Sequence, residues 1–70
     1  MKIEPAITPV WLRQVARSKR LHAQDVLSLL ARLGPDEHEE RAECIQQINE
    51  LEIQATNLDD EAHRLETDHV

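Results

Sequence analysis

The sequence predicts an all-α protein: an antiparallel helical hairpin with one helix at about 9–33, a turn at 34–36 and a second helix at about 37–67. Two long segments carry apolar residues at alternating steps of four and three, which is the heptad pattern of packed helices. A single Gly-Pro-Asp sequence separates the two segments. The 70 residues include one aromatic residue and one glycine, and 31% are charged, a composition that argues against a β fold.

The second predicted helix has the clearer pattern. Its heptad seam is unbroken, with leucine at one core position and a small residue at the other in its second half. Alanine beside leucine lets two helix axes come closer than leucine alone would allow, so we expect a tightly packed hairpin. The seam consists of Cys44, Ile48, Leu51, Ala55, Leu58, Ala62, Leu65 and His69.

The first predicted helix begins at Pro9, with Thr8 as its N-cap. Two polar residues, Lys19 and His22, fall in the middle of its seam. A buried, unpaired lysine is costly, so Lys19 must extend to solvent or meet an acid such as Glu52. The seam is Leu12, Val15, Lys19, His22, Val26, Leu29 and Leu33, and Ala16, Ala23 and Leu30 widen the apolar stripe.

The C-terminal part of the first helix is apolar on more than one face, whereas a helix of a monomeric hairpin needs only one. A chain this short buries a small core, and its single cysteine excludes an internal disulfide. We therefore expect a homodimer in which two hairpins form a four-helix bundle. The residues predicted for the core and the dimer interface are Val26, Leu27, Leu29, Leu30, Leu33, Cys44, Ile45, Ile48, Leu51, Ala55, Leu58, Ala62 and Leu65.

The turn contains recognisable capping residues. We expect Gly34 to take the left-handed conformation after the first helix, and Pro35 to prevent the helix from continuing. Asp36 and Glu39 have the spacing of a capping box at the start of the second helix. Pairing the helices about this turn sets Val26 near Cys44 and Leu12 near Leu58.

Residues 1–8 are predicted to form an extended N-terminal arm, because prolines discourage a helix there. Residues 9–70 then make up the single hairpin domain. The second helix is the longer one, and Ile3 and Ile7 of the arm are placed to cover its far end. Trp11 should be partly buried where the arm and the first helix meet.

The net charge of −6 is unevenly distributed. Residues 9–33 hold five cations against one acid, and residues 36–70 hold twelve carboxylates against two arginines. Two interpretations remain open: the halves complement each other within the hairpin, or the basic face docks an anionic partner. The candidate partner-binding residues on that face are Arg13, Arg17, Arg20, Leu21 and Gln24.

No group of residues in the sequence has the pattern of a catalytic site. Cys44 in a heptad seam is ordinarily a small buried hydrophobe, and Asp59 with His63 are too few ligands for a metal. We expect no enzymatic activity, no cofactor, no metal and no small-molecule substrate. No apolar run is long enough to cross a membrane, and the first residues lack the apolar core of a signal peptide. We therefore expect a cytoplasmic protein without membrane contact.

The stretch around the turn reads Leu29-Leu30-Ala31-Arg32-Leu33, then Asp36-Glu37, then Ala42 and Cys44. With the hairpin layout and the alternating small and leucine residues of the second helix, it resembles the Rop-like plasmid RNA-binding proteins. The resemblance implies an antiparallel four-helix homodimer that binds RNA through its paired first helices. That binding uses an aromatic residue on the first helix, and this chain has no phenylalanine, so only the architecture is carried over.

Three functions are compatible with these observations. The preferred one is a small non-enzymatic regulator or adaptor that binds another protein as a homodimeric hairpin, since the chain is acidic and has a second apolar face. The second is an RNA-binding regulator that uses the basic face of the first helix. The third is a co-chaperone that exists mainly as a heterodimer.

Overall fold

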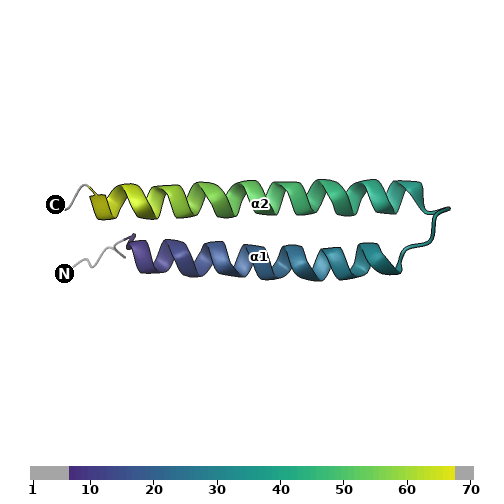
Figure 1. Ribbon diagram of the computed structural model, residues 1–70, viewed down its shortest axis with the longest axis horizontal. Coiled ribbons are helices and arrows are strands. Elements are labelled where there is room, and N and C mark those ends of the chain that lie inside the picture. Colours follow the sequence, from purple (N-terminus) through teal and green to yellow (C-terminus); the bar gives the residue numbers. More distant parts are fainter. Residues whose placement is uncertain (1–6, 68–70) are drawn as a thin grey trace, which may run out of the picture.

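The computed structural model describes residues 7–67 as two antiparallel α-helices joined by a short turn, with no strand in that range (Figure 1). Helix α1 spans Pro9–Arg32 and has 24 residues, and helix α2 spans His38–Thr67 and has 30 residues. The all-α hairpin and the helix boundaries predicted from the sequence are confirmed. Most of the expected arm, including Ile3, and the last seam position, His69, lie outside the described residues.

The start of α1 follows the predicted N-cap. The Thr8 hydroxyl accepts a hydrogen bond from the Trp11 amide at 3.1 Å, and the Thr8 carbonyl accepts one from the Leu12 amide at 3.0 Å. Pro9 occupies the first helical turn, where its missing N–H leaves no hydrogen bond unmade. Thr8 therefore fixes the point at which the helix begins.

The turn differs from the prediction. No residue from 7 to 67 has a positive φ, so Gly34 does not adopt the left-handed conformation. The reason is Pro35, because the ring of a proline pushes the preceding residue toward extended backbone. Instead, the Gly34 amide donates to Glu37 Oε2 at 2.8 Å, and the Gly34 carbonyl accepts from the Glu37 amide at 3.1 Å. This reciprocal pair of hydrogen bonds between Gly34 and Glu37 takes the place of the capping box that the sequence predicted between Asp36 and Glu39.

Arg41 connects the start of α2 to the end of α1. Its amide donates to the Glu37 carbonyl at 3.0 Å, and its guanidinium donates to the Leu33 carbonyl at 3.3 Å. The second bond satisfies a carbonyl that the end of α1 leaves without a helical partner. Glu39 and Glu40 in the first turn of α2 interact favourably with the helix dipole.

The buried core between the helices is built largely from alanine. Ala16, Ala55 and Ala62 are fully buried, Ala23 is 3% exposed, and Leu12 at 2% is the one large side chain buried to that degree among residues 7–67. Val26 and Cys44 complete the set of buried apolar residues. Small side chains at the contact allow the close approach of the two helix axes that the sequence predicted.

The seam of α1 keeps every second position of the predicted one, and the positions between them differ by one residue. His22 is exposed and Leu29 is 51% exposed, so their predicted placement in the seam is wrong, while Val15 is half-buried. Two heptad registers compete in this helix because apolar residues occupy both, and the alanine-containing register is buried since it lets the helices pack more closely. The observed seam is Leu12, Ala16, Lys19, Ala23, Val26, Leu30 and Leu33.

The seam of α2 is the predicted one. Cys44, Ala55 and Ala62 are buried. The larger members of the seam remain half-buried in the hairpin, namely Ile48, Leu51, Leu58 and Leu65. The leucine side of the seam is therefore only partly covered by α1.

Ion pairs between the helices define their relative register. Arg13 pairs with Glu66, and Arg20 pairs with Asp59 at 2.7 Å, one heptad apart on both helices. Pairing the helices about residues 34–36 predicted that Leu12, the neighbour of Arg13, would lie near Leu58. The observed partner of Arg13, Glu66, is about two helical turns farther along α2 than Leu58. Two features account for this difference. Side chains lean toward the N-terminus of their own helix, so the partners in an antiparallel pair lean toward each other. In addition, α2 begins beyond the end of α1 (Figure 1).

Candidate functional site

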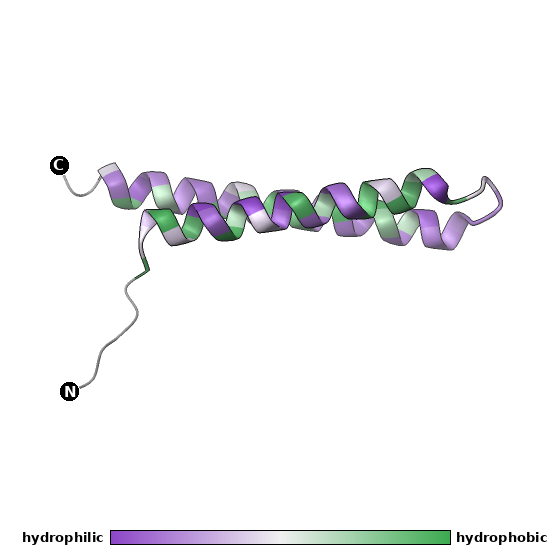
Figure 2. Ribbon diagram, turned by 90° about the horizontal axis from the view of Figure 1, so that it is seen from below, coloured by the Kyte–Doolittle hydropathy of each residue, from purple (hydrophilic) through white to green (hydrophobic). Residues whose placement is uncertain are grey.

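Each half of the hairpin leaves some large apolar residues exposed, and the halves differ in whether these residues lie beside the seam. We call residues 9–23 and 51–67 the open half, and residues 24–33 and 38–50 the turn half. The C-terminal part of α2, in the open half, is mostly hydrophilic, while hydrophobic segments continue along α1 as far as the turn (Figure 2). The predicted partner-binding residues lie in the open half except for Gln24, and the predicted dimer residues lie in both.

Two of the predicted partner-binding arginines form ion pairs within the hairpin. The Arg13 guanidinium donates two hydrogen bonds to the Glu66 carboxylate, one of them at 2.6 Å to Oε2, and Arg20 pairs with Asp59. The hydrogen bond to Glu66 raises the pKa of Arg13, and the hydrogen bond from Arg13 lowers the pKa of Glu66. These two arginines complement the acidic helix, as the first of the two charge interpretations predicted.

The rest of the predicted basic face stays exposed. Arg17, Leu21 and Gln24 are exposed, with Leu21 at 51%, and no ion pair joins Arg17 to a carboxylate within residues 7–67. The structure therefore separates the predicted set into two arginines engaged within the hairpin and three exposed residues on the outer side of α1.

The turn half leaves three large apolar residues about half exposed. Leu27 is 54% exposed, Leu29 is 51% exposed and Ile45 is 48% exposed. All three were predicted to belong to the core or the dimer interface. Each lies beside the seam and not on the outer face of its helix, so together with the half-buried seam they extend the apolar surface around this half.

One side of the turn half continues the line of the ion pairs. Leu27 follows Arg20 by seven residues on α1, and Ile45 precedes Asp59 by two heptads on α2. Positions seven apart stay on nearly the same face of a helix. The face that carries charge pairs in the open half therefore carries apolar side chains in the turn half, and we call it the ion-pair flank.

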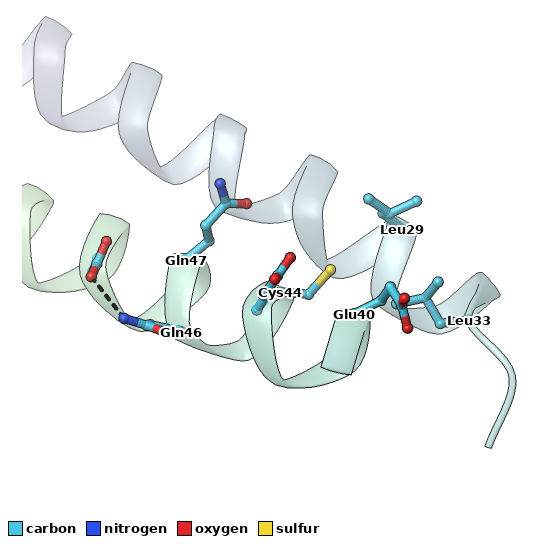
Figure 3. Close-up of a pocket in the computed structure, with 8 residues that line it drawn as sticks. Leu29, Leu33, Glu40, Cys44, Gln46 and Gln47 are labelled. Carbon is cyan, nitrogen blue, oxygen red and sulfur yellow. Dashed lines mark hydrogen bonds between the residues drawn. The ribbon is translucent and has the colours of Figure 1, made fainter. Parts of the chain in front are cut away.

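The other side of the turn half contains a hollow of about 470 Å³ between the helices (Figure 3). Leu29 reaches it from α1, Leu33 from the position directly after α1, and Cys44 from α2. The remaining lining residues all come from α2 and are acidic or amide side chains: Glu40, Glu43, Gln46, Gln47 and Glu50. Gln46 donates a hydrogen bond to Glu50 at 3.4 Å along this rim.

Sequence reasoning did not identify this rim. Charged and amide residues are common on any solvated helix face, so the sequence alone did not distinguish Glu40, Glu43 and Gln47 as site residues. The signal was their spacing: steps of three and four place them along one side of the α2 seam, next to Cys44. Finding the site required knowing which register of α1 turns Leu29 outward.

A third group of exposed apolar side chains lies at the start of α1. Ile7 is 60% exposed, Val10 is 64% exposed and Trp11 is 50% exposed. Trp11 was expected to be partly buried, and half of its surface is. Ile7 was expected to cover the far end of α2, but the described residues leave most of its own surface exposed. Ile53, on the outer face of α2, is 61% exposed and has polar neighbours three and four residues away.

The cysteine and the potential metal ligands considered in the sequence are placed as follows within residues 7–67. Cys44 is buried, and no hydrogen bond in the described part of the chain joins it to a histidine. Within the same range, no three potential metal ligands come together. Neither helix has a stretch of the length and apolarity needed to cross a bilayer, as far as the described residues extend.

No protein-family model, curated protein or solved structure matches this chain. The resemblance to Rop-like proteins therefore rests on the residues around the turn and on the hairpin layout alone.

Proposed function

We propose that the protein is a small non-enzymatic regulator or adaptor that binds another protein and acts as a homodimer of helical hairpins. The observation that supports this most strongly is the exposure of Leu27, Leu29 and Ile45, each close to half exposed beside the seam. Exposed apolar side chains that cluster beside a half-buried seam are typical of a protein interface.

The energetic argument rests on the small size of the buried core. Four of the seven buried apolar residues among the described ones are alanines, which contribute little hydrophobic stabilisation each. Completing the burial of one half-exposed leucine or isoleucine contributes about 1 kcal/mol. A second hairpin packed against the turn half adds such terms from each copy.

The ion-pair flank is the side on which we place the second copy. Leu27 and Ile45 lie on this flank, directly beside the seam of their helices. Large apolar residues beside the seam are those through which helical hairpins pair into bundles. The two ion pairs close the same flank in the open half. Contact between copies is therefore concentrated near the turn.

The test is co-purification of the tagged full chain from a nuclease-treated native lysate, with light-scattering mass measured on the same samples. The variant Leu27→Glu/Ile45→Glu is compared with Ile53→Glu, which places the same charge on the outer face of α2. We expect the wild-type chain and Ile53→Glu to be dimers that retain a protein partner, and the double variant to lose the dimer.

Two results would contradict the proposal. Recovery of nucleic acid alone from an untreated lysate, with no protein, would support the RNA-binding alternative. A stable one-to-one complex with a different small protein, formed by a chain that is monomeric alone, would support the heterodimeric co-chaperone.

A further inference from the structure

The hollow on the side away from the ion-pair flank has an apolar floor. Cys44 is 7% exposed at its base, and Leu33 is half-buried beside it. Leu29 stands over one side at 51% exposure (Figure 3). Such a floor accommodates inserted apolar side chains, because they replace water against carbon and sulfur atoms.

The rim of the hollow is acidic. Glu40, Glu43 and Glu50 line it, and no lysine or arginine is among the lining residues. Residues 36–50 hold six carboxylates against one cation, Arg41, which donates a hydrogen bond to the Leu33 carbonyl. A hollow lined by one sign of charge beside a low-dielectric wall concentrates the opposite charge from solution.

The shape suits the side chains of a helix that lies across the hollow. The space is bounded by two antiparallel helices, and a third helix extends such a pair by inserting apolar residues at steps of three and four. Positive charges on the side of that stripe that faces α2 would then reach the glutamates of the rim.

A second copy of this chain does not offer such a helix on its outer faces. The exposed group at the start of α1, Ile7, Val10 and Trp11, spans little more than one turn because the helix begins at Pro9. Farther along α1, Leu21 is the large apolar residue on the outer side, and the residues three, four and seven positions from it are polar. The same holds for Ile53 on α2. Both arginines with ion pairs in the hairpin, Arg13 and Arg20, are already engaged with α2. An outer face with one apolar residue does not supply the series of anchors that a helix in a groove requires.

We propose that this hollow, lined by Leu29, Leu33 and Cys44 and rimmed by Glu40, Glu43 and Glu50, binds a basic amphipathic helix of a partner protein. The inference rests on the proposed adaptor function and names the partner's chemistry: a leucine-type apolar stripe flanked by lysine or arginine. The homodimer contact on the ion-pair flank leaves the hollow open for it.

The probe is a fluorescently labelled helical peptide of about five turns, with leucines at steps of three and four and lysines flanking them. A second peptide has the same leucines and glutamates in place of the lysines. Fluorescence anisotropy is measured with the full chain at low and high salt. We expect the lysine peptide to bind at least tenfold more tightly than the glutamate peptide, and this preference to shrink as salt screens the rim.

The matched variants are Leu29→Ser and Leu21→Ser, because both leucines are 51% exposed in the hairpin. Leu29→Ser should weaken binding of the lysine peptide at least tenfold, and Leu21→Ser should leave it unchanged. Glu43→Lys should reduce the preference for the lysine peptide, whereas Glu52→Lys, outside the lining, should have little effect. Circular dichroism verifies that each variant stays helical.

Light-scattering mass separates this inference from the proposed function. Lost peptide binding with unchanged mass in Leu29→Ser supports the hollow as the partner site. A lower mass in Leu29→Ser would overturn the inference, because a second copy would then cover the hollow. Equal binding of both peptides, or equal effects of Leu29→Ser and Leu21→Ser, would overturn it as well. A monomeric chain that still binds the lysine peptide through Leu29 would contradict the homodimer and leave this inference standing.

Discussion

The open half and the turn half of the hairpin share one heptad pattern but bury different amounts of it. The open half contains five of the seven buried apolar residues of the described chain, and both ion pairs between the helices lie there. The turn half buries Val26 and Cys44, and leaves Leu27, Leu29 and Ile45 about half exposed. The difference arises at the positions beside the seam, which carry charge pairs in one half and apolar side chains in the other.

The open half therefore holds most of the buried core and both of these ion pairs, and the turn half is where we place the proposed binding surface. In the open half, Arg13 and Arg20 form ion pairs beside the alanine contacts, so the ion-pair flank has little apolar surface for a partner there. Apolar residues in the corresponding positions near the turn gain stability only when something else covers them.

The largest expected effect breaks the packing of the open half. Leu12 is 2% exposed, so Leu12→Ala should lower the free energy of unfolding by about 3 kcal/mol, through lost burial and the cavity left behind. Urea denaturation followed by circular dichroism measures this. Leu21→Ala removes the same atoms from the outer face of α1 and should change stability by less than about 0.5 kcal/mol. Equal losses in both variants would show that Leu12 is not packed in the core of the open half.

The next effect tests the close approach of the helices. Ala55 is fully buried, so Ala55→Leu should force the helices apart and cost about 2 kcal/mol of unfolding free energy. Ala42→Leu introduces the same side chain at an exposed position of α2 and should be close to neutral. The midpoint of thermal unfolding compares the two. A stabilised Ala55→Leu would mean that the alanine contacts leave unfilled space.

A smaller effect concerns the turn. Gly34 has no positive φ, and a Cβ placed on it meets no atom within 4 Å. Gly34→Ala should therefore stabilise the hairpin by about 0.5 kcal/mol, because it restricts the unfolded chain without straining the folded one. Urea denaturation checks the sign. A clear loss of stability would instead favour the left-handed glycine that the sequence predicted.

The smallest effect concerns the pH dependence of the open half. The hydrogen bond from Arg13 lowers the pKa of Glu66 below its ordinary value of 4.5. The pair therefore contributes stability above about pH 4.5, and this contribution is lost as the pH falls through the folded-state pKa. Wild type should be slightly more stable than Glu66→Gln at neutral pH, and the difference should disappear in acid. A difference that does not change with pH would assign the contribution to packing and not to charge.

The sequence predicted the hairpin, both helix boundaries, the Thr8 cap and the seam of α2. These features depend on local chemistry and on a heptad pattern with one consistent register. Because alanine at 55 and 62 alternates with leucine in that seam, the closely packed contact could also be predicted.

The seam of α1 could not be chosen from the sequence, since Val15 and Leu29 fit one heptad register as well as Ala16 and Leu30 fit another. The choice depends on how closely the helices approach, which is a property of both helices together. The hollow escaped prediction for the same reason, because Leu29 was assigned to the seam. The conformation of Gly34 was wrong because the restriction imposed by Pro35 outweighs the usual preference of glycine after a helix.

The most direct test of the account is the solution mass of the purified full chain across a range of concentrations, by light scattering or sedimentation equilibrium. The account predicts twice the chain mass of 8.1 kDa, with dissociation only on dilution, and an unfolding midpoint that rises with concentration. A mass of 8.1 kDa that persists at high concentration, with cooperative unfolding independent of concentration, would contradict it.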